Sequence, residues 1–254
     1  GQHRARMTAN PLTALALASL ALQPTSGLVS LGAKATARKW DDRVDAGPLG
    51  RAADGVFMAR FRAKLAKELG RDSTEPSYDG ITDLIIALHD RPGANPGSIE
   101  ASSRRVLQSL FPDWPPFNPA GTVGLLYWFG VLFARPFPAF SARLNAWVTF
   151  LAAQWLMGVC ELKDLEEAED LSRLKAGRGA GQLLLVRRCR YLEATGCASV
   201  CVNTCKMPTQ AFFNQDMSVA VTIQPDYDTM ECRFKFGLPP SPADEDDARD
   251  TPCF

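Results

Sequence analysis

Cysteine is absent before residue 160 of this 254-residue chain, and its seven cysteines all lie in the C-terminal part. A secreted disulfide scaffold instead spreads its cysteines through a short chain. Seven is an odd number, and the cysteines gather in one part of a mid-sized protein. This distribution favours metal binding or redox chemistry over covalent stapling of the fold.

Histidine is scarce, and the motifs of several common enzyme classes are missing. The chain has two histidines, His3 and His89. We interpret His89, at the end of an expected helix, as a solvated or capping residue and not as a catalytic base. The sequence has no G-x-S-x-G, no Walker motif and no dinucleotide-binding fingerprint. A hydrolase triad therefore has no convincing histidine.

Acidic residues are absent from residues 1–40, which hold five Lys or Arg among many Ala, Leu, Ser and Thr. This composition is typical of an organelle transit peptide, and we predict a transit peptide or disordered leader there. A secretory signal is the competing interpretation, since Arg4 and Arg6 precede an apolar run. The remainder has 23 basic and 28 acidic residues. No basic face stands out, which argues against a nucleic-acid partner.

No apolar run reaches the roughly 20 residues that a transmembrane helix needs. Two strongly apolar stretches, 123–133 and 147–159, still stand out in a chain that is 46% hydrophobic. We predict that 147–159 forms a central core helix, because it is apolar on nearly all sides. An apolar ligand pocket and a membrane-surface segment are the alternatives.

Hydrophobic periodicity predicts helices before these stretches. Apolar residues recur at helical spacing in residues 51–69, 79–89 and 98–111. Four prolines in residues 112–120 exclude regular structure there. We therefore predict that residues 41–160 form a mainly helical part with an apolar pocket.

The C-terminal part is expected to form a small strand–helix–strand unit. Residues 182–191 and 231–236 are strand-like and flank a cysteine-rich helix, within a module at 182–240. Charged and then glycine-rich residues predict a linker at 161–181, and residues 241–254 an acidic, solvated tail. The predicted fold class is α+β.

Five cysteines of this module indicate a metal centre. Cys197, Cys201 and Cys205 are spaced by four residues, so a helix would place their side chains on one stripe. Soft thiolates packed this closely suit an iron–sulfur cluster or zinc. Cys189 on the preceding strand and Cys232 on the following strand would complete the ligand set. The spacing matches neither the ferredoxin patterns nor ordinary zinc knuckles.

The same cysteines allow two other interpretations. They would also suit a helix–sheet interface as small buried side chains, since cysteine is among the most buried residue types. Alternatively, Cys189 or Cys232 would each pair with one helix cysteine in a disulfide. Cys160, at an expected helix end, and Cys253, in the tail, are interpreted as bystanders. Pro208 is expected to end the cysteine helix and suits the first position of the next one.

The segment from Arg188 to Phe213, RCRYLEATGCASVCVNTCKMPTQAFF, closely resembles the β-carotene isomerase family. These are the plastid, iron-containing isomerases of the Dwarf-twenty-seven type that open strigolactone synthesis. The resemblance continues through VTIQPDYDTMECRFKFGLPP and covers residues 182–254. Its motif, C-R-Y-L-E followed by three cysteines and K-x-P-T-Q, is long and specific.

This resemblance implies a chloroplast enzyme that interconverts all-trans- and 9-cis-β-carotene with iron as cofactor, in the form of an iron–sulfur cluster. It implies a carotenoid substrate and contact with a thylakoid or envelope membrane surface. Cys197, Cys201 and Cys205 are the expected metal ligands, with Cys189 and Cys232 completing or neighbouring the site.

Two functions of other classes remain open. One is a non-enzymatic plastid iron–sulfur or thiol protein, which would act as a structural or partner-docking module. The other is a thiol–disulfide protein. Lys206, Thr209 and Gln210 also match the family motif, and we interpret them as residues that cap and connect two helices.

Overall fold

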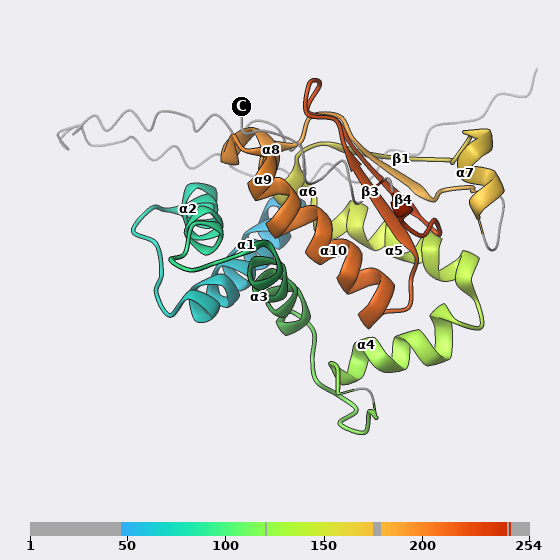
Figure 1. Cartoon of the computed structure of the whole chain (residues 1–254), viewed down its shortest axis with the longest axis horizontal. Coiled ribbons are helices and arrows are strands. Elements are labelled where there is room, and N and C mark those ends of the chain that lie inside the picture. Colours follow the sequence, from blue (N-terminus) through green and yellow to red (C-terminus); the bar gives the residue numbers. More distant parts are fainter. Residues whose placement is uncertain (1–46, 120, 175–178, 243, 245–254) are drawn as a thin grey trace, which may run out of the picture. The chain divides into compact units, whose positions relative to one another are not determined.

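The computed structural model describes residues 47–119, 121–174, 179–242 and 244, which all fall within one unit, 37–254 (Figure 1). The predicted leader, most of the predicted acidic tail and the last cysteine lie outside the described residues. The described part combines helices with a four-stranded antiparallel sheet. The predicted α+β class is confirmed.

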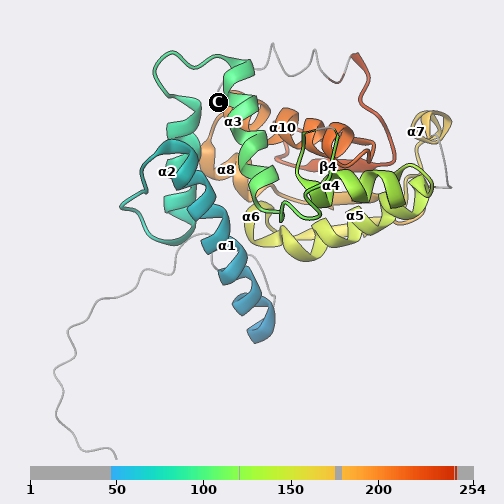
Figure 2. The same ribbon diagram turned by 90° about the horizontal axis from the view of Figure 1, so that it is seen from below.

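The three helices predicted from N-terminal periodicity are present as α1 (Gly47–Leu69), α2 (Ser77–His89) and α3 (Pro96–Ser109). They pack against one another at one end of the described part (Figures 1 and 2). A capping box starts α3: the Ser98 N–H donates to Asn95 Oδ1 at 3.0 Å, and the Asn95 N–H donates to Ser98 Oγ at 2.9 Å. The helices bury a shared apolar cluster, Phe61, Leu65, Ile81, Leu84, Ile85, Leu88, Ile99 and Val106.

The two apolar stretches form a helical hairpin. Helix α4 (Gly124–Phe129) runs into the π-helical turn η2 (Gly130–Ala134), and α5 (Pro138–Ala152) and the short α6 (Gln154–Met157) follow. Helix α5 begins at Pro138 because proline lacks an N–H that the first helical turn would leave unbonded anyway. Among the described residues, no helix combines the length and apolar character that crossing a membrane requires.

The prediction that 147–159 forms a central core helix is wrong. Helix α5 ends at Ala152, and its side chains Trp147 and Leu151 are 54% and 51% exposed. The residues that α5 buries are small ones, among them Ala142 and Ala146. Small residues let the helix backbone approach the sheet closely, so the large side chains remain on the outer face.

Four short strands form an antiparallel sheet in the order β1-β2-β4-β3. Their bounds are Cys160–Lys163 for β1, Leu183–Val186 for β2, Val221–Pro225 for β3 and Cys232–Phe236 for β4. β2 and β4 confirm the two expected strands. β1 lies mostly within the expected linker, 161–181, and pairs with β2 as the edge strand. Strands of four or five residues are too short to give a clear periodic signal.

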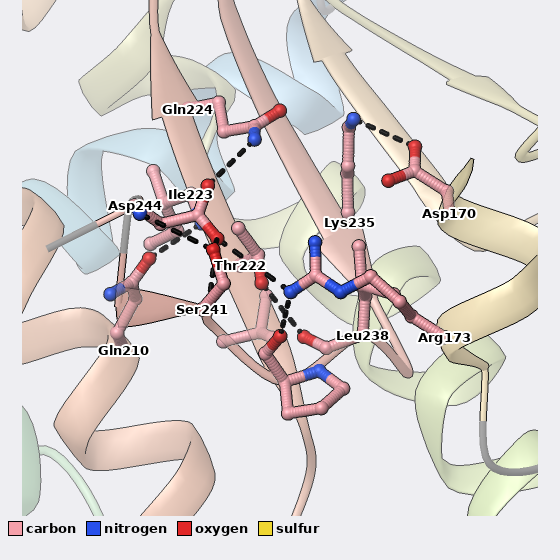
Figure 3. Close-up of polar contacts among 12 residues, drawn as sticks. Asp170, Arg173, Gln210, Thr222, Ile223, Gln224, Lys235, Leu238, Ser241 and Asp244 are labelled. Carbon is pink, nitrogen blue, oxygen red and sulfur yellow. Dashed lines mark hydrogen bonds and ion pairs between the residues drawn. The ribbon is translucent and has the colours of Figure 1, made fainter. Parts of the chain in front are cut away.

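Alternate residues of β4 point to opposite faces of the sheet. Phe234 and Phe236 join the apolar core shared with the helices. Lys235, between them, faces the other side, where α7 (Ala168–Arg173) lies. There its Nζ lies 2.7 Å from Asp170 Oδ2, and both side chains are buried (Figure 3). The sheet therefore has one apolar face and one more polar face, on which this buried ion pair lies.

One continuous helical path carries the central cysteines. After α8 (Arg190–Thr195), Gly196 adopts a left-handed conformation with φ 62°. The path then runs through α9 (Ala198–Cys201), η3 (Val202–Lys206), α10 (Met207–Ala211) and η4 (Phe212–Asp216).

The prediction that Pro208 ends this helix is wrong, although Pro208 does lie in the first turn of α10 as its alternative role required. In the π-helical turn before it, the Met207 N–H reaches Val202 O, five residues back. This wider turn lets the helical path continue past a residue that has no N–H to donate.

Candidate functional site

The five cysteines predicted to bind a cofactor gather near the start of this helical path and the adjacent end of the sheet. Cys189 is the N-cap of α8, Cys197 the N-cap of α9, Cys201 the last residue of α9, Cys205 part of η3 and Cys232 the first residue of β4. Cys197 has extended φ and ψ of −148° and 122°. The expected helical stripe of three cysteines is therefore wrong. Only Cys201 and Cys205 lie on the helical path, and Cys197 lies just before it.

Strand pairing brings Cys189 and Cys232 together. Val186, at the end of β2, pairs with Cys232 at the start of β4. Three residues after Val186, the Cys189 N–H donates to Met230 O at 2.7 Å. Cys189 thus lies just beyond β2, and not on the strand as expected.

The thiols of Cys189, Cys201, Cys205 and Cys232 are free, so the expected disulfides of Cys189 and Cys232 with a helix cysteine are wrong. Burial raises the pKa of Cys205 to about 12 and raises those of the other three thiols. Neighbouring cysteines raise the pKa of Cys232 further, and all three of the others contribute. The four sulfur atoms therefore lie within electrostatic reach of one another, as neutral thiols at neutral pH.

Cys197 differs from this group because its sulfur is disulfide-bonded. It is also less buried than Cys189, Cys201 and Cys232. Metal ligation by Cys197 would first require reduction of that bond.

The four free thiols agree with an iron–sulfur cluster in number and in chemical softness. Metals bind the thiolate, and burial raises the pKa of these thiols, so metal binding would have to release their protons. Within the described ranges, no three His, Cys, Asp or Glu side chains form a group that could hold a metal ion. As arranged here the residues do not fit such a centre, and ligation by Cys197, Cys201 and Cys205 stays a prediction.

An apolar cavity of about 50 Å³ lies beside Cys205. It is roughly a third of the ~150 Å³ known for a cavity that binds benzene. No charged side chain lines it. Side chains of α1, α2 and α3 form one wall of the cavity, and residues of the cysteine-rich segment form most of the opposite wall. The full lining consists of Phe61, Leu65, Ile85, Leu88, Ser103, Val106, Leu107, Leu156, Tyr191, Thr204, Cys205 and Thr209.

Hydrogen bonds hold the polar groups of Tyr191, Thr204 and Thr209 in this cavity, whereas the buried Ser103 Oγ has no hydrogen-bond partner. The Tyr191 hydroxyl bonds Thr204 Oγ1, which also donates to Val200 O at 2.6 Å. Thr209 bonds the Cys205 thiol, which lowers the pKa of that thiol without overcoming the effect of burial. The cavity thus presents one thiol and a few hydroxyl groups, of which that of Ser103 is unbonded, to an otherwise apolar space.

Two buried tyrosines and an arginine lie next to the thiols, and sequence reasoning missed all three. The Arg190 guanidinium stacks 3.7 Å from the centre of the Tyr78 ring, and its Nη1 donates to Trp155 O at 3.0 Å. Burial raises the pKa of Tyr78 and Tyr191 well above its usual value, and nearby cysteines add to both shifts. The C-R-Y-L-E motif signalled Arg190 and Tyr191, whereas Tyr78 comes from α2 and carried no signal.

Lys206 and Gln210 were expected to cap and connect two helices, but they bind the segment after β4 and the sheet, respectively. The Gln210 Oε1 accepts from the Ile223 N–H at 2.7 Å (Figure 3). The buried Lys206 Nζ donates to Asp244 O. These two contacts fix the cysteine-bearing helical path against β3 and the segment after β4.

The expected solvation of the acidic tail is wrong at Asp244, which is buried. Its carboxylate accepts from Gln224 Nε2 at 2.8 Å and from the Ser241 N–H at 2.8 Å (Figure 3). Burial alone would raise the pKa of Asp244, but these hydrogen bonds outweigh it and lower the pKa.

His89, which was expected to be a solvated or capping residue and not a base, is half-buried and links two helices. Its Nε2 lies 3.0 Å from Ser199 Oγ in α9, and its Nδ1 lies 2.7 Å from Asp90 Oδ1. These contacts give His89 a structural role at the end of α2.

Cys160, which lies outside the predicted ligand set but near Cys189, allows a separate test of thiol burial. Burial raises its pKa to about 12, and its Sγ donates to Gly158 O at 3.3 Å. An unfolded thiol titrates near 8.5, so above that pH the unfolded chain loses a proton that the folded chain retains. The free energy of unfolding should therefore fall between about pH 9 and pH 12, by up to about 1.4 kcal/mol per pH unit for this thiol.

Urea unfolding at a series of alkaline pH values would measure this effect, with Cys160→Ala as the matched variant. The parent protein should lose stability more steeply with pH than the variant. Equal slopes would show that Cys160 does not stay protonated in the folded state.

A family model described as "Beta-carotene isomerase D27-like, C-terminal" matches residues 155–245. The chain is similar to this family over residues 155–245. The proteins named "Beta-carotene isomerase D27, chloroplastic" from Arabidopsis thaliana and Medicago truncatula are 29% and 33% identical, over 114 and 100 residues. These matches cover 45% and 39% of this chain.

The chain matches less than half the length of these curated relatives, 40% of the first and 36% of the second. No solved structure matches it significantly. The family segment includes all five predicted cofactor-binding cysteines and the sheet. The helices α1 to α3, which form the opposite wall of the cavity, lie outside that segment.

Proposed function

We propose that this chain is a chloroplast carotenoid cis/trans isomerase that interconverts all-trans- and 9-cis-β-carotene, in strigolactone or related apocarotenoid synthesis. The observation that carries the proposal is the family segment, which supplies a thiol at the edge of an apolar cavity. Both curated relatives are named as chloroplastic beta-carotene isomerases. The acid-free composition of residues 1–40 supports a plastid address.

The lining of the cavity is apolar enough for a hydrocarbon ligand, but its volume is too small for one. Its lining is uncharged, and the hydroxyl groups of Tyr191 and Thr204 in it are bonded to each other. Its volume of about 50 Å³ is too small for the cyclic end group of a carotene, which is larger than benzene. Substrate entry therefore requires the helices of one wall, α1 to α3, to move away from Tyr191 and Cys205.

Rotation about a polyene double bond requires its bond order to fall transiently. Reversible addition would achieve this: the sulfur of Cys205 bonds one carbon and its proton goes to the adjacent carbon. Rotation about the resulting single bond and the reverse elimination return the free thiol and the other isomer. Thr209, which bonds this thiol, would orient it toward the cavity.

Iron dependence is the second part of the proposal, and the family resemblance supports it. Protein purified without oxygen is expected to contain iron and to absorb visible light, and Cys201→Ser should lower the iron content. Cys160→Ser is the matched control, because Cys160 lies outside the predicted ligand set. Iron-free, colourless protein that isomerises carotene would contradict this part.

The isomerase proposal is tested in bacteria that accumulate β-carotene, by chromatography of the extracted isomers. Cells that express the chain should show a 9-cis fraction several-fold above cells with an empty vector. An unchanged isomer ratio with soluble, folded protein would contradict the proposal.

A structural cysteine module is the second candidate, because Cys189, Cys201 and Cys232 are buried in the apolar core. It predicts that Cys201→Ser lowers the free energy of unfolding while carotene isomer ratios are the same with and without the protein. A thiol–disulfide protein fits less well, since burial raises the pKa of the free thiols and lowers their reactivity. Counting free thiols before and after reduction would test it.

A further inference from the structure

Helix α5 has its large apolar side chains on the outside. Ala142 and Ala146, which it buries, are small. Phe140, Trp147 and Leu151 recur at helical spacing and are 56%, 54% and 51% exposed. These three side chains do not pack against the sheet, so packing within the fold does not explain why they are large and apolar.

The same pattern continues through the hairpin that precedes α5. Leu132 and Phe133 of η2 are exposed, and Phe137 at the turn between η2 and α5 is 58% exposed. We define the apolar face as Leu132, Phe133, Phe137, Phe140, Trp147, Val148 and Leu151. Exposed apolar surface concentrated on neighbouring elements marks an interaction site in soluble proteins.

The charges within the hairpin segment itself have a single sign. No acidic residue occurs between Asp113 and Glu161, whereas Arg135 and Arg143 are exposed within the hairpin. Two copies of this face would bring the arginines of both copies together without an acidic partner from the face itself. An anionic surface complements both the apolar and the basic groups.

We propose that the apolar face docks on the surface of an anionic lipid membrane, with α5 lying in the headgroup region. Tryptophan and phenylalanine favour this interfacial region, and arginine pairs with anionic headgroups. The inference rests on exposed side chains and not on the isomerase proposal, so vesicle binding without isomerisation leaves it intact.

The first test is flotation of the full chain with phosphatidylcholine vesicles, with or without phosphatidylglycerol. Binding should be strongest with phosphatidylglycerol and should weaken at high salt. The variant Phe140→Ser/Trp147→Ser/Leu151→Ser should lower the partition coefficient at least about tenfold. Val56→Ser/Phe57→Ser, which removes exposed apolar side chains from α1, is the matched control and should bind like the parent.

A charge variant tests the same face with less risk to folding. Arg135→Glu/Arg143→Glu should abolish the preference for phosphatidylglycerol, whereas Lys67→Glu/Arg71→Glu, at exposed positions in and after α1, should leave most of it.

Quenching of tryptophan fluorescence by brominated lipids locates the contact. The Trp147→Phe variant should lose much of the quenching, because the side chain that enters the bilayer is removed. Trp155→Phe, at a buried position, should retain it.

Three results would overturn the inference. The parent chain could fail to float with either vesicle, or the triple serine variant could float equally well while Trp147→Phe retains full quenching. Light scattering could instead reveal a dimer that the triple variant dissociates, which would make the apolar face an interface between two copies of this chain.

Discussion

Replacing Arg104 by alanine is expected to lower the free energy of unfolding by about 3–5 kcal/mol. Arg104 on α3 donates two hydrogen bonds to Asp216 at the end of η4, from Nη2 to Oδ1 at 2.6 Å and from Nε to Oδ2 at 2.9 Å. The Asp216 side chain is fully buried, whereas that of Arg104 is 25% exposed. Removing Arg104 leaves a buried carboxylate whose one other side-chain contact is Gln108 Nε2 at 2.9 Å.

The neighbouring Arg105 provides the matched control. It pairs with Glu68 at 2.5 Å, but its side chain is 56% exposed. Water screens such a pair, so Arg105→Ala should cost less than about 1 kcal/mol. Urea unfolding of both variants measures the difference. Similar losses for the two variants would contradict the assigned importance of the buried pair.

Filling the cavity beside Cys205 is expected to lower carotene isomerisation at least tenfold, which corresponds to about 1.4 kcal/mol in the activation barrier. Leu107 on α3 lines the cavity and is only partly buried. The variant Leu107→Trp would occupy the space that the substrate end group needs, while its exposed side leaves room for the larger ring. The measurement is the initial rate of isomer formation in detergent micelles.

Leu110→Trp is the control for this variant. Leu110 immediately follows α3 and packs partly buried against the core, but it does not line the cavity. The activity of Leu110→Trp should stay near that of the parent chain. Thermal unfolding of both variants distinguishes a loss of folding from a loss of the site. Full activity in Leu107→Trp would show that substrate does not use this cavity.

The N-terminal helices were predictable because their signal is local. Ile81, Leu84, Ile85 and Leu88 recur at helical spacing, and all four are buried in α2. The same reasoning failed for α5, where both faces are apolar. Which face is buried depends on how closely the helix must approach the sheet, and small residues such as Ala146 decided it.

The cysteine site likewise combines features that the sequence predicted with features that it did not. Spacing identified Cys201 and Cys205 as helical neighbours, but Cys197 proved to be an N-cap outside the helix. The wall of the cavity that α3 provides depends on contacts between segments about one hundred residues apart, such as Leu107 and Cys205. No local pattern encodes such contacts.

The α+β class, the first three helices and the family resemblance of residues 155–245 were predictable from the sequence, because periodicity and motif are properties of short segments. Only the tertiary structure decided that Cys189, Cys201, Cys205 and Cys232 converge as buried free thiols and that α5 presents its aromatic side to solvent. Both outcomes follow from the packing of the helices on one face of the sheet, which depends on complementary shapes across the whole fold.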